Sequence, residues 1–301
     1  MTAKAKIINS LQKELDEAKQ GVLLVVELLN KDELNILIED TSAIVDKFYL
    51  MVDKACEKAS DHAIVKTAEL TKLYIVVPDD SKVAEQLAYS VYSQVQLYVD
   101  AEYPESYLKC AVSSIKFSAE RKIKANRLIS MMVYGMSMSS DGSYYYSYDD
   151  HPVDVEKLRA DNINLNLLRT SLFQGKAKFM YQPVVDRESG NIEYYECLLR
   201  VQDQNNNFIS VGPMIEDAET KGLISIVDFT VVEMAINELA NDTKIKLSVN
   251  VSNIGVLNKR LLKRIENLLK KFDVADRLII EITETSLNHD FTTTKKFIDA
   301  L

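Results

Sequence analysis

Polar side chains interrupt or end three apolar segments in the C-terminal half of the chain. Glu196 interrupts one apolar strand, Asn250 ends Leu-Ser-Val-Asn, and Glu281 ends Leu-Ile-Ile-Glu, with Glu284 one turn further on. Two carboxylates and an amide supply the oxygen ligands that Mg²⁺ or Mn²⁺ prefers. A metal ion held by such a set could make hydroxide from water and screen a phosphodiester. These residue types therefore predict a metal-dependent phosphodiester site, if the fold brings them together.

The segments that carry these residues alternate between strand and helix patterns. Near-continuous apolar strands joined by amphipathic helices indicate a parallel sheet covered by helices, as in a TIM-like (β/α) barrel, whose functional residues lie at the carboxyl ends of the strands. The region from 178 to 301 is shorter than the roughly 250 residues of a typical barrel, so we expect only the N-terminal half of one. The predicted strands are 178–185, 192–201, 244–251 and 278–282, and the predicted helices are 212–221, 226–241, 257–272 and 290–301.

The N-terminal part predicts a separate α/β domain at 21–150, preceded by an amphipathic helix at 1–20 and followed by a linker helix at 151–177. The helix at 1–20 could pack on its own domain or pair with a second copy. The predicted strands of this domain are 22–28, 73–77, 108–117 and 144–148, and its predicted helices are 32–58, 81–100 and 119–137.

Composition excludes several functional classes. The net charge of −9 argues against binding to a nucleic-acid polymer, which needs a basic surface. The three cysteines and three histidines are scattered, which argues against a disulfide framework, a zinc site or a Ser-His-Asp triad. We find no signal peptide and no apolar run of about 18 residues, so we expect a cytoplasmic protein without a membrane span.

Five segments of the C-terminal region resemble the EAL family, in order and at matching spacing over about 178–301. The family opens with strands that read Q-P-I-V-D and E-A-L-L-R, and continues with a helix, an N-x-S strand and an E-x-T-E strand. The corresponding segments here are Tyr-Gln-Pro-Val-Val-Asp at 181–186, Tyr-Glu-Cys-Leu-Leu-Arg at 195–200, the helix pattern at 209–224, Val-Asn-Val-Ser at 249–252 and Glu-Ile-Thr-Glu at 281–284.

The resemblance implies a metal centre of bacterial cyclic-di-GMP signalling. EAL phosphodiesterases hydrolyse cyclic di-GMP to the linear dinucleotide with two divalent metal ions. By resemblance, Glu196, Asn250 and Glu281 are ligands of Mg²⁺ or Mn²⁺, and Glu284 lies beside them. Cys197 replaces the family's usual alanine, a small-for-small change that we expect to be tolerated.

The resemblance also implies three contacts to the dinucleotide, from Gln182, Leu198 and Arg200. A guanidinium suits this role because it can form two parallel hydrogen bonds to a phosphate. The family continues with a D-D-F-G loop, a catalytic lysine, a glutamate and a glutamine, whereas this sequence ends at Leu301. We therefore expect a truncated EAL domain with an incomplete catalytic set, and no hydrolysis from the 301-residue polypeptide alone.

The N-terminal domain resembles the GGDEF (diguanylate cyclase) family in its order of strands and helices, but the signature is degenerate. The hairpin that carries G-G-D-E-F aligns with Glu-Leu-Thr-Lys-Leu at 69–73, and the family's metal-binding aspartates align with Glu27 and Leu29. An inhibitory R-x-x-D motif, expected near 60–63, is absent. We therefore expect a regulatory or dimerising domain and no diguanylate cyclase activity.

Three hypotheses remain open. The first is a non-catalytic receptor or regulator that binds cyclic di-GMP, or only a protein partner, through the EAL-like half. The second is a fragment of an active EAL phosphodiesterase, which the retained Glu196, Asn250 and Glu281 support. The third is an interaction scaffold without nucleotide, which the acidic surface and the basic helix at 257–272 support.

Overall fold

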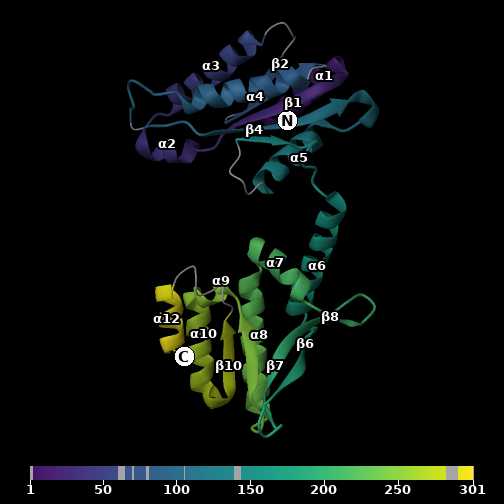
Figure 1. Ribbon diagram of the computed structural model, residues 1–301, viewed down its shortest axis with the longest axis vertical. Helices are drawn as coiled ribbons and strands as arrows, with labels where there is room; N and C mark the ends of the chain where they lie inside the picture. The colour runs from purple at the N-terminus through teal and green to yellow at the C-terminus, as the bar shows by residue number, and fades with distance from the viewer. Residues whose placement is uncertain are drawn as a thin grey trace. The chain divides into compact units, whose positions relative to one another are not determined.

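The structure, a computed structural model, divides into two compact units, Met1–Asp154 and Val155–Leu301. Figure 1 shows them in purple to teal and in teal to yellow. Each unit has its own five-stranded sheet and its own hydrophobic core. No helix in the described part of the chain is long and apolar enough to cross a membrane. The described residues are 3–59, 65–69, 71–78, 81–104, 106–138, 144–282 and 291–300.

The N-terminal unit alternates helices with the strands of one mixed sheet, and its predicted α/β character is confirmed. Its elements are α1 (Ala3–Ala18), β1 (Gln20–Leu28), α2 (Lys31–Leu37), α3 (Ser42–Lys58), β2 (Val65–Glu69), β3 (Lys72–Pro78), α4 (Ser81–Gln96), β4 (Cys110–Ser118), η1 (Ala119–Arg121), α5 (Ala125–Met138) and β5 (Tyr145–Ser147).

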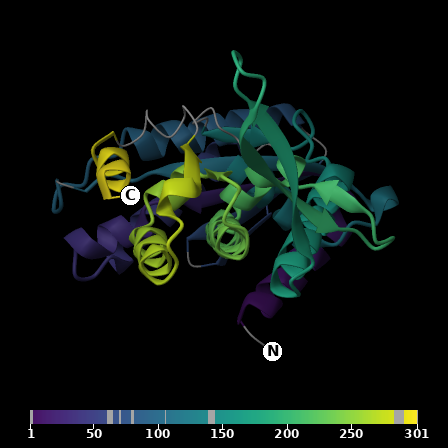
Figure 2. The ribbon, with the colours of Figure 1, turned by 90° about the horizontal axis from the view of Figure 1, so that it is seen from below.

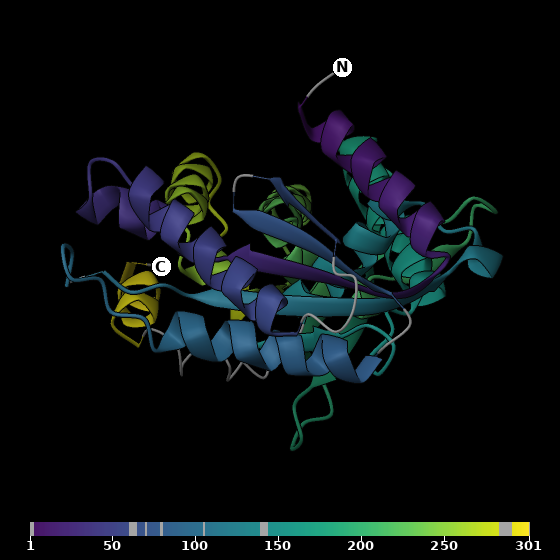
Figure 3. The ribbon, with the colours of Figure 1, turned by 90° about the horizontal axis from the view of Figure 1, so that it is seen from above.

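Helices cover both faces of this sheet, whose strand order is β2-β3-β1-β4-β5 (Figure 3). Leu24 and Val26 of β1 share a core with α3 and α4, whereas Leu23 and Val25 share the opposite core with α1 and α5. A strand that is covered on both sides needs apolar residues at successive positions, which is why 22–26 reads as a continuous apolar run. Helix α1 packs on its own unit.

The helix predicted at 32–58 is two helices, α2 and α3, so that prediction was wrong in the middle. The Thr41 hydroxyl donates to Asn35 Oδ1 at 2.7 Å, and the backbone N–H of Ser42 donates to Asp40 Oδ1 at 2.9 Å. Short polar side chains that bond nearby groups offer the backbone an alternative to continuous helix. No glycine or proline marks this break in the sequence.

The C-terminal unit has a sheet with the order β10-β9-β7-β6. The short strand β8 lies outside this order and pairs with the end of β7. Helices α8 and α10 lie side by side along one face of it, and Figure 2 shows both nearly end-on. Its elements are α6 (Val155–Phe173), β6 (Ala177–Val185), β7 (Ile192–Gln202), β8 (Phe208–Ser210), α7 (Gly212–Thr220), α8 (Ile224–Asn241), β9 (Leu247–Val251), α9 (Asn253–Val256), α10 (Lys259–Lys271), η2 (Ala275–Arg277), β10 (Leu278–Ile282) and α12 (Phe291–Ala300).

The sheet of this unit is mixed, so the prediction of an all-parallel sheet was wrong at its first strand. Strands β7, β9 and β10 are parallel, but β6 is antiparallel to β7. The connection between β6 and β7 is too short for the crossover that parallel strands need. It is a tight turn in which Asp186 accepts hydrogen bonds from Ser189, and Gly190 adopts a φ of 70°. Such a φ favours glycine.

Candidate functional site

Alternation along β7 separates a helix-covered face from a polar face. Cys197, Leu199 and Val201 are buried under the helices, with at most 6% of their surface exposed. Glu196, Leu198 and Arg200 point to the opposite face, because successive side chains of a strand alternate. The register of the other strands places Gln182, Asn250 and Glu281 on this face as well. The term polar face is used below for the face that carries these six residues.

The predicted metal ligands come together on the polar face. Glu281 of β10 lies directly opposite Asn250 of β9 in the parallel register, and Glu196 of β7 lies opposite Ser248. Asn250 Nδ2 donates a hydrogen bond to Glu196 Oε1 at 2.9 Å. Because the amide nitrogen is committed to Glu196, the amide oxygen Oδ1 remains as an acceptor. Three adjacent strands thus present two carboxylates and one amide oxygen.

This donor set fits a hard divalent cation. Carboxylate and amide oxygens suit Mg²⁺ or Mn²⁺, and no thiol or imidazole competes among these ligands. Ser248 supports the fit, since its side chain is completely buried and its hydroxyl has no hydrogen-bond partner among the described residues. Ser248 lies opposite Glu196 in the register of β7 and β9, and it is two residues before Asn250, so its side chain points to the same face. A buried hydroxyl without a partner indicates an acceptor that the protein itself does not supply.

The cation site is small within the described residues. Among these residues no group of three or more His, Cys, Asp or Glu side chains gathers there, and the ligands brought together are two carboxylates and one amide. Glu284, which was expected beside these ligands, lies outside the described residues. Its role stays a prediction.

The three predicted dinucleotide contacts continue the polar face along β6 and β7. Gln182 lies directly opposite Glu196 in the antiparallel register, and its side chain is exposed. Leu198 and Arg200 follow Glu196 at every second position, and both are half-buried. Arg200 Nη1 donates to the carbonyl oxygen of Leu199 at 3.0 Å, which holds the guanidinium near its own strand.

Negative charge gathers around the buried thiol behind Glu196. Burial raises the pKa of Cys197 to about 12, and the carboxylates of Glu238, Glu196 and Glu281 add to this rise. Cys197 is 3% exposed and packs in the helix-covered core. The side chain therefore serves packing on the face opposite the candidate site.

A buried carboxylate beside β9 was not predicted from the sequence. Asp228 of α8 is only 2% exposed. It accepts hydrogen bonds from the hydroxyl of Ser252 at 2.6 Å and from the backbone N–H of Ser252 at 3.1 Å. Burial raises the pKa of Asp228, and both bonds from Ser252 oppose that rise. The one available sequence signal was a single acid inside the otherwise uncharged segment Ile-Ser-Ile-Val-Asp-Phe-Thr-Val-Val.

Asp228 and Ser252 fix the backbone just after Asn250. The Ser252 hydroxyl also accepts from the backbone N–H of Gly255 at 3.0 Å, which caps α9. A side chain at Gly255 would place its Cβ 2.3 Å from Asp228 Oδ2, so only glycine leaves room for the carboxylate. The turn after β9 is therefore held from α8, and this turn determines where the strand that carries Asn250 ends.

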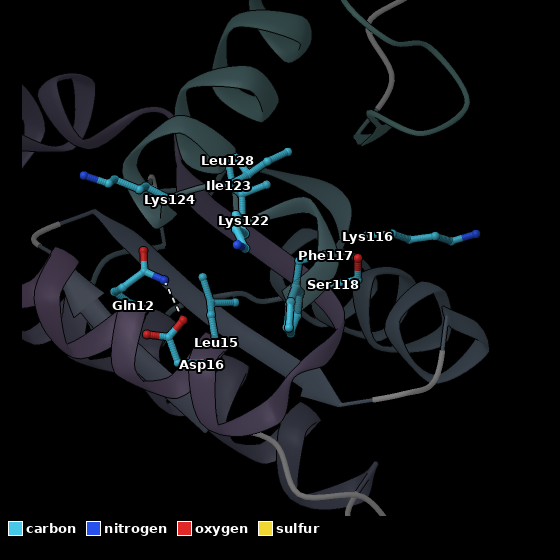
Figure 4. Close-up of a pocket in the computed structure, with 11 residues that line it drawn as sticks. Gln12, Leu15, Asp16, Lys116, Phe117, Ser118, Lys122, Ile123, Lys124 and Leu128 are labelled. Atoms are coloured by element: carbon cyan, nitrogen blue, oxygen red, sulfur yellow. Dashed lines mark hydrogen bonds between the residues drawn. The ribbon is translucent and has the colours of Figure 1, made fainter.

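A separate pocket lies in the N-terminal unit and shares no residue with the polar face. It has a volume of about 290 Å³ between α1, the end of β4 and the start of α5. Leu15, Phe117 and Leu128 form its apolar floor. Figure 4 shows Gln12 and Asp16 joined by a hydrogen bond on the α1 side, whereas Lys116 and Lys124 point away from the centre.

Comparisons with known proteins match parts of this chain. Residues 165–301 match a family model described as EAL domain. A protein named Cyclic di-GMP phosphodiesterase PdeF from Escherichia coli is 30% identical over 127 residues, which are 40% of this chain and 17% of that protein. The uncharacterized protein y4lL of Sinorhizobium fredii is 30% identical over 122 residues, which are 40% of this chain and 15% of that protein. The chain thus spans less than a fifth of the length of these relatives.

Solved structures with a low overall similarity include EAL domains. The Xanthomonas citri FimX EAL domain in complex with c-diGMP is 22% identical with a TM-score of 0.44, and the match covers 49% of this chain and 59% of that one. Vibrio cholerae LapD S helix-GGDEF-EAL, bound to c-di-GMP, is 17% identical with a TM-score of 0.43, and the match covers 98% of this chain and 71% of that one. The residues that match the EAL family model, 165–301, lie within the C-terminal unit.

Proposed function

We propose that this chain acts in cyclic-di-GMP signalling and that the polar face of its C-terminal unit binds cyclic di-GMP. The observation that carries this proposal is the convergence of Glu196, Asn250 and Glu281 from three adjacent parallel strands. The match of residues 165–301 to the EAL domain supports the nucleotide class.

We infer that Glu196, Asn250 and Glu281 hold one Mg²⁺ or Mn²⁺ ion. When bound, such a cation would neutralise a phosphodiester and lower the pKa of a bound water. The side chains of this chain orient the ligand. Gln182 lies beside Glu196 and can bond the dinucleotide, and Leu198 gives it an apolar contact. Arg200 places a positive charge further along the same face.

The receptor role is the first form of this proposal. In this form the chain binds cyclic di-GMP without hydrolysing it. The second form is metal-dependent hydrolysis of cyclic di-GMP, which the identity to a phosphodiesterase over 127 residues supports. A scaffold that binds only protein is the outcome if no nucleotide binds.

Isothermal titration of the chain with cyclic di-GMP separates these forms. The receptor predicts saturable binding, with no linear dinucleotide after overnight incubation with Mn²⁺, as measured by chromatography. Turnover would support the phosphodiesterase, and absence of binding with and without Mn²⁺ would contradict the proposal. Binding of Mn²⁺ alone, followed by electron paramagnetic resonance, should be lost in Glu196→Gln and kept in Glu193→Gln. Glu193 is the matched control because it is an exposed glutamate of β7 that has no partner residue in the pairing with β6.

For the N-terminal unit we propose a regulatory role without cyclase activity. Lys72 of β3 lies opposite Glu27 of β1, and Lys72 Nζ is 3.1 Å from Glu27 Oε1. An ammonium group thus neutralises the carboxylate that aligns with a metal ligand of diguanylate cyclases. Incubation with GTP and Mg²⁺ should give no cyclic di-GMP, and formation of the product would contradict this role.

A further inference from the structure

Two positive side chains face each other directly on the polar face. Lys178 of β6 lies opposite Arg200 of β7 in the antiparallel register. The Cβ atoms of such a pair are about 5 Å apart, and like charges at this spacing destabilise a sheet. The two facing cations therefore lower the stability of the sheet, and the fold does not require both.

No carboxylate in the described part of the chain neutralises this pair. The Lys178 ammonium lies 5.1 Å from the centre of the Phe208 ring, and Arg200 donates to the backbone of Leu199. Neither side chain takes part in any of the ion pairs found among the described residues. Arginine has five N–H donors and lysine has three, so most of their hydrogen-bonding capacity remains available. An anion from outside the protein would satisfy both.

The distance between the Lys178–Arg200 pair and the candidate metal ligand Glu196 sets the size of the ligand that could touch both. Arg200 is four residues beyond Glu196 on the same face of β7, which corresponds to about 13 Å along the strand. A ligand that touches both positions must therefore be larger than a mononucleotide phosphate. Leu198 lies between them, and Phe208, which is 42% exposed, borders the cation pair. A candidate cation site and a pair of cations on one face, with apolar side chains beside them, match a ligand that carries two phosphates and flat bases.

We propose that Lys178 is a second phosphate-binding residue, and that it and Arg200 together hold the ligand phosphate remote from Glu196. The identity of the ligand rests on the proposed function, but the anion site itself rests on the uncompensated pair. Lys178 supplies a point charge from β6, and Arg200 supplies the planar hydrogen-bonding group from β7. An anion bound between them relieves the repulsion that the free protein bears.

The test compares Lys178→Ala with Lys176→Ala, which removes another exposed lysine just before β6. In titrations with cyclic di-GMP and Mn²⁺, Lys178→Ala should raise the Kd about fivefold, and Lys176→Ala should leave it within about twofold. Lys178→Arg should keep near-wild-type affinity. The defect should shrink at about 0.5 M salt, because exposed charges are screened. The melting temperature of unliganded Lys178→Ala should not fall, since the substitution removes a repulsion.

Affinity of Lys178→Ala within about twofold of the wild type would overturn the inference while leaving the proposed function intact. If the wild type binds no cyclic di-GMP, the proposed function fails. The anion site is then judged with inorganic pyrophosphate, which should raise the melting temperature of the wild type and of Lys176→Ala more than that of Lys178→Ala. Equal shifts in the three proteins would overturn the inference.

Discussion

Replacing Ser252 with alanine tests whether α8 holds the end of the strand that carries Asn250. The change removes the 2.6 Å hydrogen bond to Asp228 Oδ2 and the acceptor that caps α9 at Gly255. A hydrogen bond to a charged group contributes about 1.5–3 kcal/mol, and a helix cap contributes about 1 kcal/mol. Because one hydroxyl serves both, we expect a loss of about 3 kcal/mol rather than the full sum.

Urea unfolding followed by circular dichroism measures this loss. With a slope of about 2 kcal/mol per molar urea, the midpoint of the affected transition should fall by about 1.5 M. Since the chain has two units, hydrogen exchange of a peptide that covers 247–256 reports the local effect directly. Ser252→Thr keeps the hydroxyl and is the control. Wild-type behaviour of Ser252→Ala, or equal damage from Ser252→Thr, would refute the reasoning.

The same substitution should change the pH dependence of folding. Burial already raises the pKa of Asp228, and loss of the Ser252 bond raises it further. A carboxyl group whose pKa is higher in the folded state binds more protons there, so its contribution to stability falls as the pH rises above about 4. The defect of Ser252→Ala should therefore be smaller near pH 4.5 than at pH 7. An equal defect at both pH values would contradict this account of Asp228.

Other parts of the chain make further predictions. Gly255→Ala should destabilise by about 2 kcal/mol, because its Cβ would lie 2.3 Å from a carboxylate oxygen, while Gly212→Ala, whose nearest contact is 3.6 Å, should be nearly neutral in the same urea assay. Lysine and tyrosine hydrogen bonds hold the pKa of the buried Asp100 well below its usual range. This contribution is complete above about pH 4 and is lost as the pH falls further, so Asp100→Asn should cost about 2 kcal/mol at pH 7 and show a flatter acid decline. Burial raises the pKa of Cys110 to about 12, so its thiol should resist iodoacetamide at pH 8 until urea is added, and rapid labelling of the folded protein would contradict its burial.

The sequence indicated the candidate metal-binding residues better than it indicated the strand arrangement around them. Asn250 and Glu281 were noticeable because each is a polar residue in an apolar run, one residue before its strand ends. The direction of β6 could not be read from its apolar pattern, which is the same in parallel and antiparallel sheets. The short turn from Asp186 to Gly190 was the available signal, and it favours a hairpin.

Contacts between distant segments were beyond sequence reasoning. Asp228 and Ser252 are 24 residues apart and meet only because α8 packs across β9. Lys178 and Arg200 become neighbours only once the register of β6 and β7 is fixed. Patterns of local periodicity describe one element at a time, so they cannot report which polar side chains two elements bring together.

The alternation along β7 has a consequence for mutational scans of this strand. Positions 196, 198 and 200 face the polar side, whereas 197, 199 and 201 are buried under helices. One library of β7 variants can be selected separately for nucleotide binding and for folding. The first selection should therefore be sensitive at positions 196, 198 and 200, and the second at positions 197, 199 and 201. A strand of this kind could change its ligand specificity at every second position while its contribution to the core stays constant.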